Sequence, residues 1–457
     1  MRRPNVLLLY TDQQRWDTVC CAGYPYVHTP NLDALAARGA LFDNAFCNNP
    51  VCMPSRQSML SGQYASALGS VTNGIEMRED VPTVWTVLKP YGYHAANIGK
   101  LHFKNHSNRD HREPHPTYGL DTLILSDEPG CYDDAYIKWV SEKDPSQVEN
   151  CRCGTPPAWI GKPIEKPRRG IEPYAFRGPE DLTHSAFVAE ETADFIRRHK
   201  DETFFAIAGF YAPHEPLNPP QRFIDMYDSA TLPAPAMNEG EDRFGLSEGG
   251  WHNVRAHYYA LISHIDDQIG HILSALDDAG LREDTVVIFT SDHGEHLGDH
   301  GTIGKGPPGF DSCTHVPLIV SWPGRVREGV RFNEIIEAVD LAPTVLDWCG
   351  VQVPPFMQGR SFRALLEGGR YEPRRSAFIE HRMPFSDSWK TVRTLEFKYC
   401  ASNKGVELLY DLRADPGELR NVAGEPRYLE PLNDMRGELL KRWFDVEKQY
   451  PLRTGRY

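Results

Sequence analysis

Four short apolar runs constrain the fold of this chain more than any other feature. Each run is continuous rather than alternating, and each meets polar or charged residues within a few positions. The runs and the first candidate residue after each are 5–10 before Asp12, 93–98 before Lys100, 203–211 before His214 and 285–290 before Asp292. Continuous apolar runs are typical of strands that are covered on both faces. We therefore expect these segments to be buried strands of one sheet.

Segments with helical spacing of apolar residues lie between the runs, at 29–38, 182–199 and 254–276. Strands that alternate with helices predict an α/β fold with a large, mostly parallel sheet sandwiched by helices. In such a sheet the ligand binds beyond the carboxyl ends of the strands. Asp12, Lys100, His214 and Asp292 are therefore expected to converge at one edge of the sheet.

The length of 457 residues exceeds the usual size of one domain, and the pattern changes near the C-terminus. We expect a catalytic α/β domain at 1–370, in which 103–181, rich in Pro, His and Arg, forms a substrate-loop insertion. A smaller α+β subdomain is expected at 371–457. Its predicted elements are short antiparallel strands and one helix, at 376–381, 390–394, 397–401, 407–412 and 428–448.

The formal charge of −14 argues against nucleic acid or an anionic membrane surface as a partner. If such an acidic protein handles an anion, it must concentrate positive charge locally. The N-terminal apolar run is too short for a signal peptide, and no segment is long enough to span a membrane. The ten cysteines are scattered, so reduced thiols and a cytoplasmic location are expected.

The sequence Cys52-Met-Pro-Ser-Arg56 carries the strongest chemical signal. Pro54 suits the first turn of a helix, which places Cys52 at the helix N-terminus, where free N–H groups stabilise an anion. Arg56, one turn later, can direct its guanidinium to the same place. From these residues alone Cys52 could be a low-pKa thiolate nucleophile or a buried structural cysteine.

These five residues resemble the C-x-P-S-R signature of the type I sulfatases, which belong to the alkaline phosphatase superfamily. Other motifs agree in order and spacing along nearly the whole chain: Thr11-Asp12, Gly99-Lys100-Leu101-His102, Pro213-His214, Ser291-Asp292-His293-Gly294, Gly304-Lys305, Leu409-Tyr410-Asp411-Leu412 and Asp415-Pro416-Gly417-Glu418. The resemblance implies an alkaline phosphatase-like fold. It also implies that a formylglycine-generating enzyme converts Cys52 to formylglycine, an aldehyde whose hydrate is the nucleophile.

Asp12 and Asp292 are hard oxygen ligands at two strand ends, which suits one divalent cation. Gln13 and His293 are expected to complete the shell, together with an oxygen on the modified Cys52. Many sulfatases have Asp where Gln13 stands and Asn where His293 stands. The resemblance to the sulfatases favours calcium as the metal. The imidazole of His293 also admits manganese or zinc. The Asp-Gln and Asp-His arrangement is shared with the phosphonate monoester hydrolases.

Arg56, Lys100 and Lys305 supply the positive charge that an anionic substrate requires. The resemblance places Lys305 and His214 at the leaving group and Lys100 on the sulfate oxygens. It makes His102 the base that takes a proton from the second hydroxyl of the modified Cys52, which releases sulfate. Asp292 is the expected acceptor of the first proton.

Three hypotheses follow. The leading one is hydrolysis of an organic sulfate monoester, aryl or carbohydrate, so that the partners are a small-molecule or saccharide sulfate ester and the maturation enzyme. The alternative is a phosphonate monoester or phosphodiester hydrolase that uses the same machinery. The third is a catalytically silent binding protein with unmodified Cys52. The sequence leaves the oligomeric state open, a homo-oligomer included.

Overall fold

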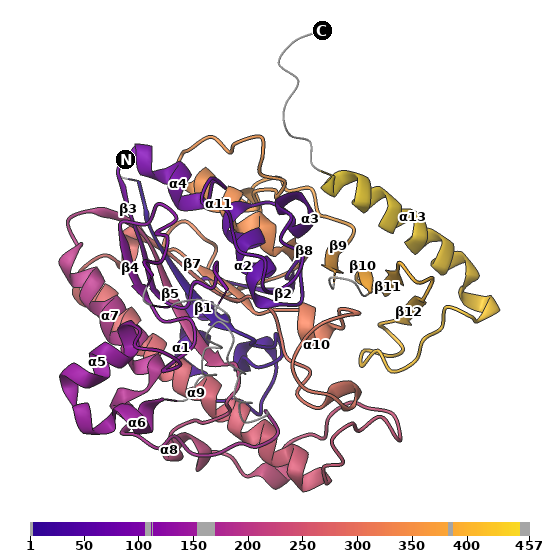
Figure 1. The fold of residues 1–457 in the computed structure, drawn as a ribbon. Coiled ribbons are helices and arrows are strands. Elements are labelled where there is room, and N and C mark those ends of the chain that lie inside the picture. The colour runs from indigo at the N-terminus through magenta and orange to yellow at the C-terminus, as the bar shows by residue number, and fades with distance from the viewer. Residues whose placement is uncertain (1–2, 106–110, 112, 153–169, 383–386, 448–457) are drawn as a thin grey trace, which may run out of the picture.

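The fold was analysed in a computed structural model that describes residues 3–105, 111, 113–152, 170–382 and 387–447. Its central feature is an eight-stranded sheet with the order β4-β3-β5-β1-β6-β7-β2-β8 (Figure 1). Every neighbouring pair is parallel except those of β7, which runs antiparallel to both β6 and β2. The strands are β1 (Asn5–Asp12), β2 (Ala40–Phe46), β3 (Tyr93–Gly99), β4 (Thr122–Leu125), β5 (Thr203–Pro213), β6 (Thr285–Ser291), β7 (Leu318–Ser321) and β8 (Val330–Glu337).

Helices cover both faces of this sheet, as the continuous apolar runs predict. Leu7 and Leu9 of β1 pack into the core beneath α1, α7 and α9, while Val6 and Leu8 face the core beneath α2, α4 and α11. A strand that is buried on both faces carries apolar side chains on both of them, so its sequence does not alternate. The longer helices are α1 (Pro30–Ala37), α2 (Cys52–Ser61), α5 (Ala135–Lys143), α7 (His184–Arg198), α9 (Glu248–Asp278) and α11 (Leu341–Trp348), and the short ones are α3 (Ala65–Leu68), α4 (Val84–Leu88), α6 (Val148–Cys151), α8 (Gln221–Ile224), α10 (Asp311–Thr314) and α12 (Arg363–Leu366).

A separate four-stranded antiparallel sheet with the order β12-β11-β10-β9 follows, and α13 (Leu429–Val446) packs on it (Figure 1). Its strands are β9 (Ala377–Arg382), β10 (Ser388–Arg393), β11 (Phe397–Ser402) and β12 (Glu407–Asp411). Phe378, Val392 and Leu409 of the sheet form a small core with Leu432 and Met435 of the helix. The predicted fold class, a large mostly parallel sheet with a smaller antiparallel sheet and helix, is confirmed.

The structure adds elements that the apolar runs do not reveal. The strands β2, β7 and β8 extend the large sheet on one side. The insertion at 103–181, for which the sequence shows little periodicity, contributes the edge strand β4 and the helices α5 and α6. All four residues of β4 are only half-buried, and its apolar run, 123–125, is shorter than the four runs that the sequence analysis singled out.

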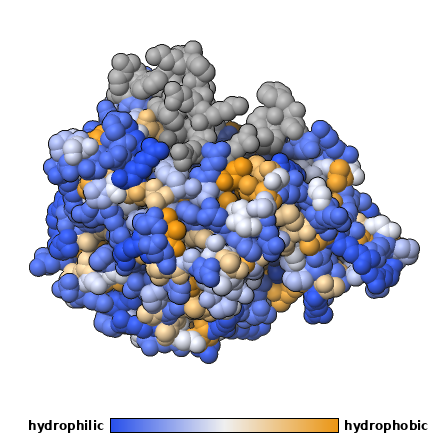
Figure 2. Space-filling view, turned by 90° about the horizontal axis from the view of Figure 1, so that it is seen from below, coloured by the Kyte–Doolittle hydropathy of each residue, from blue (hydrophilic) through white to orange (hydrophobic). Residues whose placement is uncertain are grey.

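The surface seen in Figure 2 is largely hydrophilic, with small separate hydrophobic areas. Among the helices in the described part of the chain, none has the length and hydrophobicity needed to cross a bilayer.

A buried charge network joins the two sheets. Arg442 of α13 donates to Glu337 at the end of β8 (2.9 Å) and to the hydroxyl of Tyr64 (2.8 Å). Arg374 forms a second ion pair with Glu337 at 3.0 Å. These side chains are all buried, so each charge depends on its partners for compensation.

We predict that Arg442→Met lowers the free energy of unfolding by about 3 kcal/mol, because it removes one partner of the buried Glu337. The control is Arg436→Met on the same helix, whose ion pair with Glu407 is exposed; it should cost less than about 1 kcal/mol. Urea denaturation of both variants measures the difference. Equal losses would show that the buried network does not hold the two sheets together.

Candidate active site

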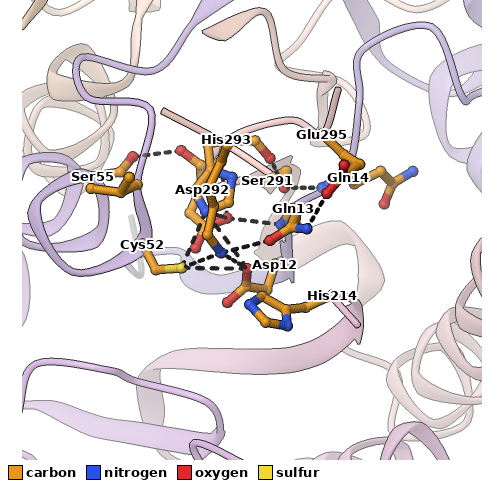
Figure 3. Close-up of polar contacts among 12 residues, drawn as sticks. Asp12, Gln13, Gln14, Cys52, Ser55, His214, Ser291, Asp292, His293 and Glu295 are labelled. Atoms are coloured by element: carbon orange, nitrogen blue, oxygen red, sulfur yellow. Dashed lines mark hydrogen bonds and ion pairs between the residues drawn. The ribbon is translucent and has the colours of Figure 1, made fainter. Parts of the chain in front are cut away.

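The carboxyl ends of β3, β5, β1 and β6 lie side by side in the sheet and carry the residues singled out in the sequence. Asp12 is the last residue of β1, and Lys100, His214 and Asp292 directly follow β3, β5 and β6. The structure brings all four together at one edge. Figure 3 shows Asp12, His214 and Asp292 there, with Cys52 pointing toward them.

Two glycines allow Lys100 to reach this edge. Gly99 has a φ of 89°, and a Cβ added to it would lie 2.1 Å from the carbonyl oxygen of Gly209. A Cβ on Gly209 would lie 2.2 Å from the carbonyl oxygen of Lys100. This close approach, which a side chain at either glycine would block, lets the Lys100 amide donate to the carbonyl oxygen of Gly209 at 2.8 Å.

Helix α2 begins at Cys52, as the motif predicts, and its first turn forms hydrogen bonds with Asp292, which follows β6. The Ser55 hydroxyl donates to the carbonyl oxygen of Asp292 at 2.5 Å. Arg56 donates from Nε to Asp292 Oδ2 at 2.7 Å, and its guanidinium lies over the ring of Tyr10. The helix N-terminus is therefore fixed with the Cys52 side chain directed at the strand ends.

The Cys52 thiol is not activated in this environment. Burial, with the charge of Asp12 second, raises the pKa of Cys52 to about 12 despite the nearby charge of Lys305. Desolvation therefore outweighs both the helix N-terminus and the lysine. Burial therefore opposes a low-pKa thiolate at the unmodified cysteine.

Four buried side chains offer ligand atoms within 4.8 Å of one another: Asp12, Cys52, Asp292 and His293. Nδ1 of His293 contacts the carbonyl oxygen of Gly294 at 2.8 Å, which requires the proton on Nδ1. The lone pair of Nε2 then points at Cys52 Sγ, 3.2 Å away, and lies 3.7 Å from Asp12 Oδ1. Burial lowers the pKa of His293 to about 4, which keeps the ring neutral. This donor set fits a divalent metal ion.

Gln13, with a φ of 69°, completes the group and is held by residues that the sequence analysis did not single out. Its Nε2 donates to Glu215 Oε2 at 3.0 Å. It also donates to Glu295, as Figure 3 shows. Because the amide nitrogen faces these carboxylates, Oε1 is turned inward, where Lys305 Nζ donates to it at 2.6 Å. Gln13 can therefore offer an oxygen to the same cation.

Glu295 also holds the loop that carries Lys305. One of its oxygens accepts from the amide of Gly304, and the other accepts from Gln13. Burial and then the charge of Glu215 raise the pKa of Glu295 to about 7. In the sequence Glu215 directly follows His214, and Glu295 directly follows the Asp292-His293-Gly294 motif. Their position next to these motifs was the one sequence signal that could have identified them.

Three cations meet the requirement for local positive charge. Lys100 Nζ lies 2.7 Å from Asp12 Oδ2, Arg56 pairs with Asp292, and Lys305 Nζ lies 2.9 Å from Cys52 Sγ. Although burial opposes it, Lys100 and Lys305 hold the pKa of Asp12 well below its usual range. Lys100, Arg56 and Lys305 therefore place three positive charges beside Asp12 and Asp292, and this local positive charge suits an anionic substrate.

Two histidines lie at the site, and their surroundings differ. Burial, followed by the charge of Lys100, holds the pKa of His102 well below its usual range, so this ring is neutral. The amide of His102 donates to Asp127 at 2.8 Å, which fixes a backbone with a φ of 56°. Nδ1 of His214 contacts the carbonyl oxygen of Glu215 at 2.8 Å, and its ring contacts Tyr211.

The sheet and this site define a hydrolase with the alkaline phosphatase type of fold. The Sulfatase family model matches residues 4–351, and the model described as N-sulphoglucosamine sulphohydrolase, C-terminal matches residues 298–444. The chain therefore belongs to the sulfatase family.

Individual relatives span almost the full chain. An arylsulfatase of Clostridium perfringens is 31% identical over 98% of this chain and 96% of its own. An N-acetylglucosamine-6-O-sulfatase of Bacteroides thetaiotaomicron is 25% identical over 98% of this chain and 87% of its own. The crystal structure of the phosphonate monoester hydrolase of Agrobacterium radiobacter has a TM-score of 0.86 and 26% identity, over 98% of this chain and 97% of that one.

We predict that Glu295→Gln weakens retention of a divalent metal about 10–100-fold. The new amide must keep an oxygen toward the Gly304 amide, so its NH2 group faces Nε2 of Gln13 and turns the Gln13 oxygen away. The control Glu241→Gln alters an exposed carboxylate that accepts from Asn238 in a similar pairing. Elemental analysis after dialysis against graded chelator measures retention, and equal metal content in both variants would contradict this role of Glu295.

Proposed function

We propose that this protein hydrolyses an organic sulfate monoester, aryl or carbohydrate, with formylglycine at position 52 and one divalent metal ion. The observation that carries the proposal is the position of Cys52. Its Sγ lies among the ligand atoms of Asp12, Asp292 and His293 and 2.9 Å from Lys305 Nζ. A group at the N-terminus of α2 is thus surrounded by metal donors and cations, which suits a nucleophile that attacks an anion.

Asp12, Gln13, Asp292 and His293 are the residues that would hold the metal, with calcium first and manganese or zinc as alternatives. The bound ion would supply charge that stabilises a deprotonated oxygen nucleophile, and the oxidised Cys52 would supply that oxygen. The maturation enzyme is the partner that this modification requires.

The remaining steps fall to side chains of the chain itself. Lys100 binds the sulfate oxygens, and Arg56 supplies positive charge beside Asp292. Lys305 and His214 neutralise the bridging oxygen, which gains charge as its bond to sulfur breaks. Asp292 is the acceptor of the first proton. His102, neutral and close to Lys100, takes the second proton when sulfate is released. The arylsulfatase and N-acetylglucosamine-6-O-sulfatase relatives support a sulfate ester as the substrate.

A second candidate is hydrolysis of phosphonate monoesters or phosphodiesters. The Asp12-Gln13 and Asp292-His293 pairs favour it, because they match the arrangement of the phosphonate monoester hydrolases. The solved enzyme of that class from Agrobacterium radiobacter also resembles this chain over nearly its whole length.

The two candidates are separated by kcat/KM on 4-nitrophenyl sulfate, a 4-nitrophenyl phosphodiester and a 4-nitrophenyl phenylphosphonate. We expect the highest kcat/KM on the sulfate. A kcat/KM on the phosphonate well above that on the sulfate would reverse the order of the two candidates.

Cys52→Ala should abolish turnover and leave the melting temperature close to that of the wild type, because the side chain acts as a nucleophile precursor. Cys52→Ser should be equally inactive, since a serine needs its own oxidase to become an aldehyde. Mass spectrometry of the Cys52 peptide provides the matching chemical test. An intact thiol from a host that modifies sulfatases would overturn the formylglycine proposal and favour the silent binding protein.

A further inference from the structure

A second group of metal-ligating side chains lies at the opposite end of the sheet from Cys52. It consists of His94, His199 and Glu202. His94 is the second residue of β3, His199 is the C-cap residue of α7, and Glu202 lies in the turn before β5. Six residues of extended strand separate His94 from Lys100, which is about 20 Å. This group therefore has no part in the catalytic edge.

The three side chains already face one another. His94 Nδ1 lies 3.3 Å from Glu202 Oε2, and His199 Nδ1 lies 3.2 Å from Glu202 Oε1. A tetrahedral zinc ion with bonds of about 2.0–2.1 Å separates its ligand atoms by about 3.3 Å. Both imidazole–carboxylate distances match that separation, so an ion could enter with small side-chain adjustments.

Neighbouring elements orient both imidazoles. His94 Nε2 is 2.8 Å from the hydroxyl of Thr122 on β4; a proton on Nε2 that donates to this oxygen leaves the Nδ1 lone pair for a metal. His199 stacks on Phe195 of its own helix, and the Glu202 amide donates to the His199 carbonyl oxygen at 3.0 Å. The ligands thus come from rigid elements and one tight turn.

Exposure and charge also fit a cation. The side chains of His94 and His199 are 22% and 21% exposed, while Glu202 is 53% exposed, which leaves a water-accessible side for a further ligand. Asp121 interacts electrostatically with His94, and it pairs with Lys89 at 2.7 Å. Because Lys89 is neutralised by this carboxylate, it adds little repulsion toward a bound ion.

We propose that His94, His199 and Glu202 form a zinc site separate from the active centre. Two imidazole nitrogens and one carboxylate oxygen favour zinc over calcium or magnesium, which take mainly oxygen ligands. The bound ion would connect β3 to the junction of α7 and β5, and through Thr122 it would also fix the edge strand β4. Its effect is on the stability of this side of the sheet.

The test counts zinc per chain in the full-length protein with its active-site metal retained. After equilibrium dialysis against zinc chloride with excess magnesium and calcium, the wild type should hold one more zinc per chain than His199→Ala. The control is His271→Ala, which removes a histidine that is 69% exposed and lies near one carboxylate, that of Asp267, at 4.0 Å. This control should bind as much zinc as the wild type. Since all three proteins share the same active centre, zinc exchange there cancels in the comparison.

A second measurement separates zinc binding from a loss of fold. Without zinc, the wild type and His199→Ala should have similar circular dichroism spectra. Zinc should then raise the melting temperature of the wild type with increasing concentration and leave that of His199→Ala unchanged. Glu202→Gln, which keeps the shape but loses the charge, should weaken zinc binding about tenfold or more. Equal zinc content in the wild type and His199→Ala would overturn the proposal and leave the group as a simple ion-pair cluster.

Discussion

The active centre depends on the compensation of two carboxylates, Asp12 and Asp292, that are buried at the ends of neighbouring strands. Burying a charge costs several kcal/mol unless it is paired. Lys100 compensates Asp12, and Arg56 compensates Asp292. The ion pairs therefore bring the end of β3 and the first turn of α2 to β1 and β6, and the same contacts place Cys52 in the centre. The same contacts therefore stabilise both the site and this edge of the sheet.

Local patterns in the sequence predicted the residues at the strand ends, because a buried strand and the side chain after it are encoded within about ten positions. Glu215 and Glu295 escaped prediction because their partner, Gln13, is about 200 and 280 positions away and the contact depends on how the loops return. The strands β2, β7 and β8 were missed because their apolar runs are short or interrupted by polar residues: β8, for example, contains Arg331, Asn333 and Glu334. The domain boundaries, the site roles and the cytoplasmic location stay predictions.

The charge around Gln13 bears on the choice between sulfate and phosphonate. A neutral amide in place of a carboxylate leaves a bound cation with one negative charge fewer among its direct ligands. The structure places two carboxylates, Glu215 and Glu295, directly behind that amide. The negative charge thus lies on residues that contact the ligand Gln13 rather than on a direct ligand. A comparison of the charge at this site with that of a sulfatase with Asp at this position must include both the direct ligands and the residues that contact them.

The small C-terminal sheet takes part in the active centre through the loop that carries Lys305. Lys398 of β11 donates to the carbonyl oxygen of Gly309 at 3.0 Å and pairs with Asp311 and Glu418. Thr391 of β10 donates to the carbonyl oxygen of Pro308 at 2.8 Å. These buried contacts fix the C-terminal end of the loop, while Glu295 fixes its beginning at Gly304. The position of the Lys305 ammonium therefore depends on both sheets, which explains why the second sheet is packed against the catalytic edge.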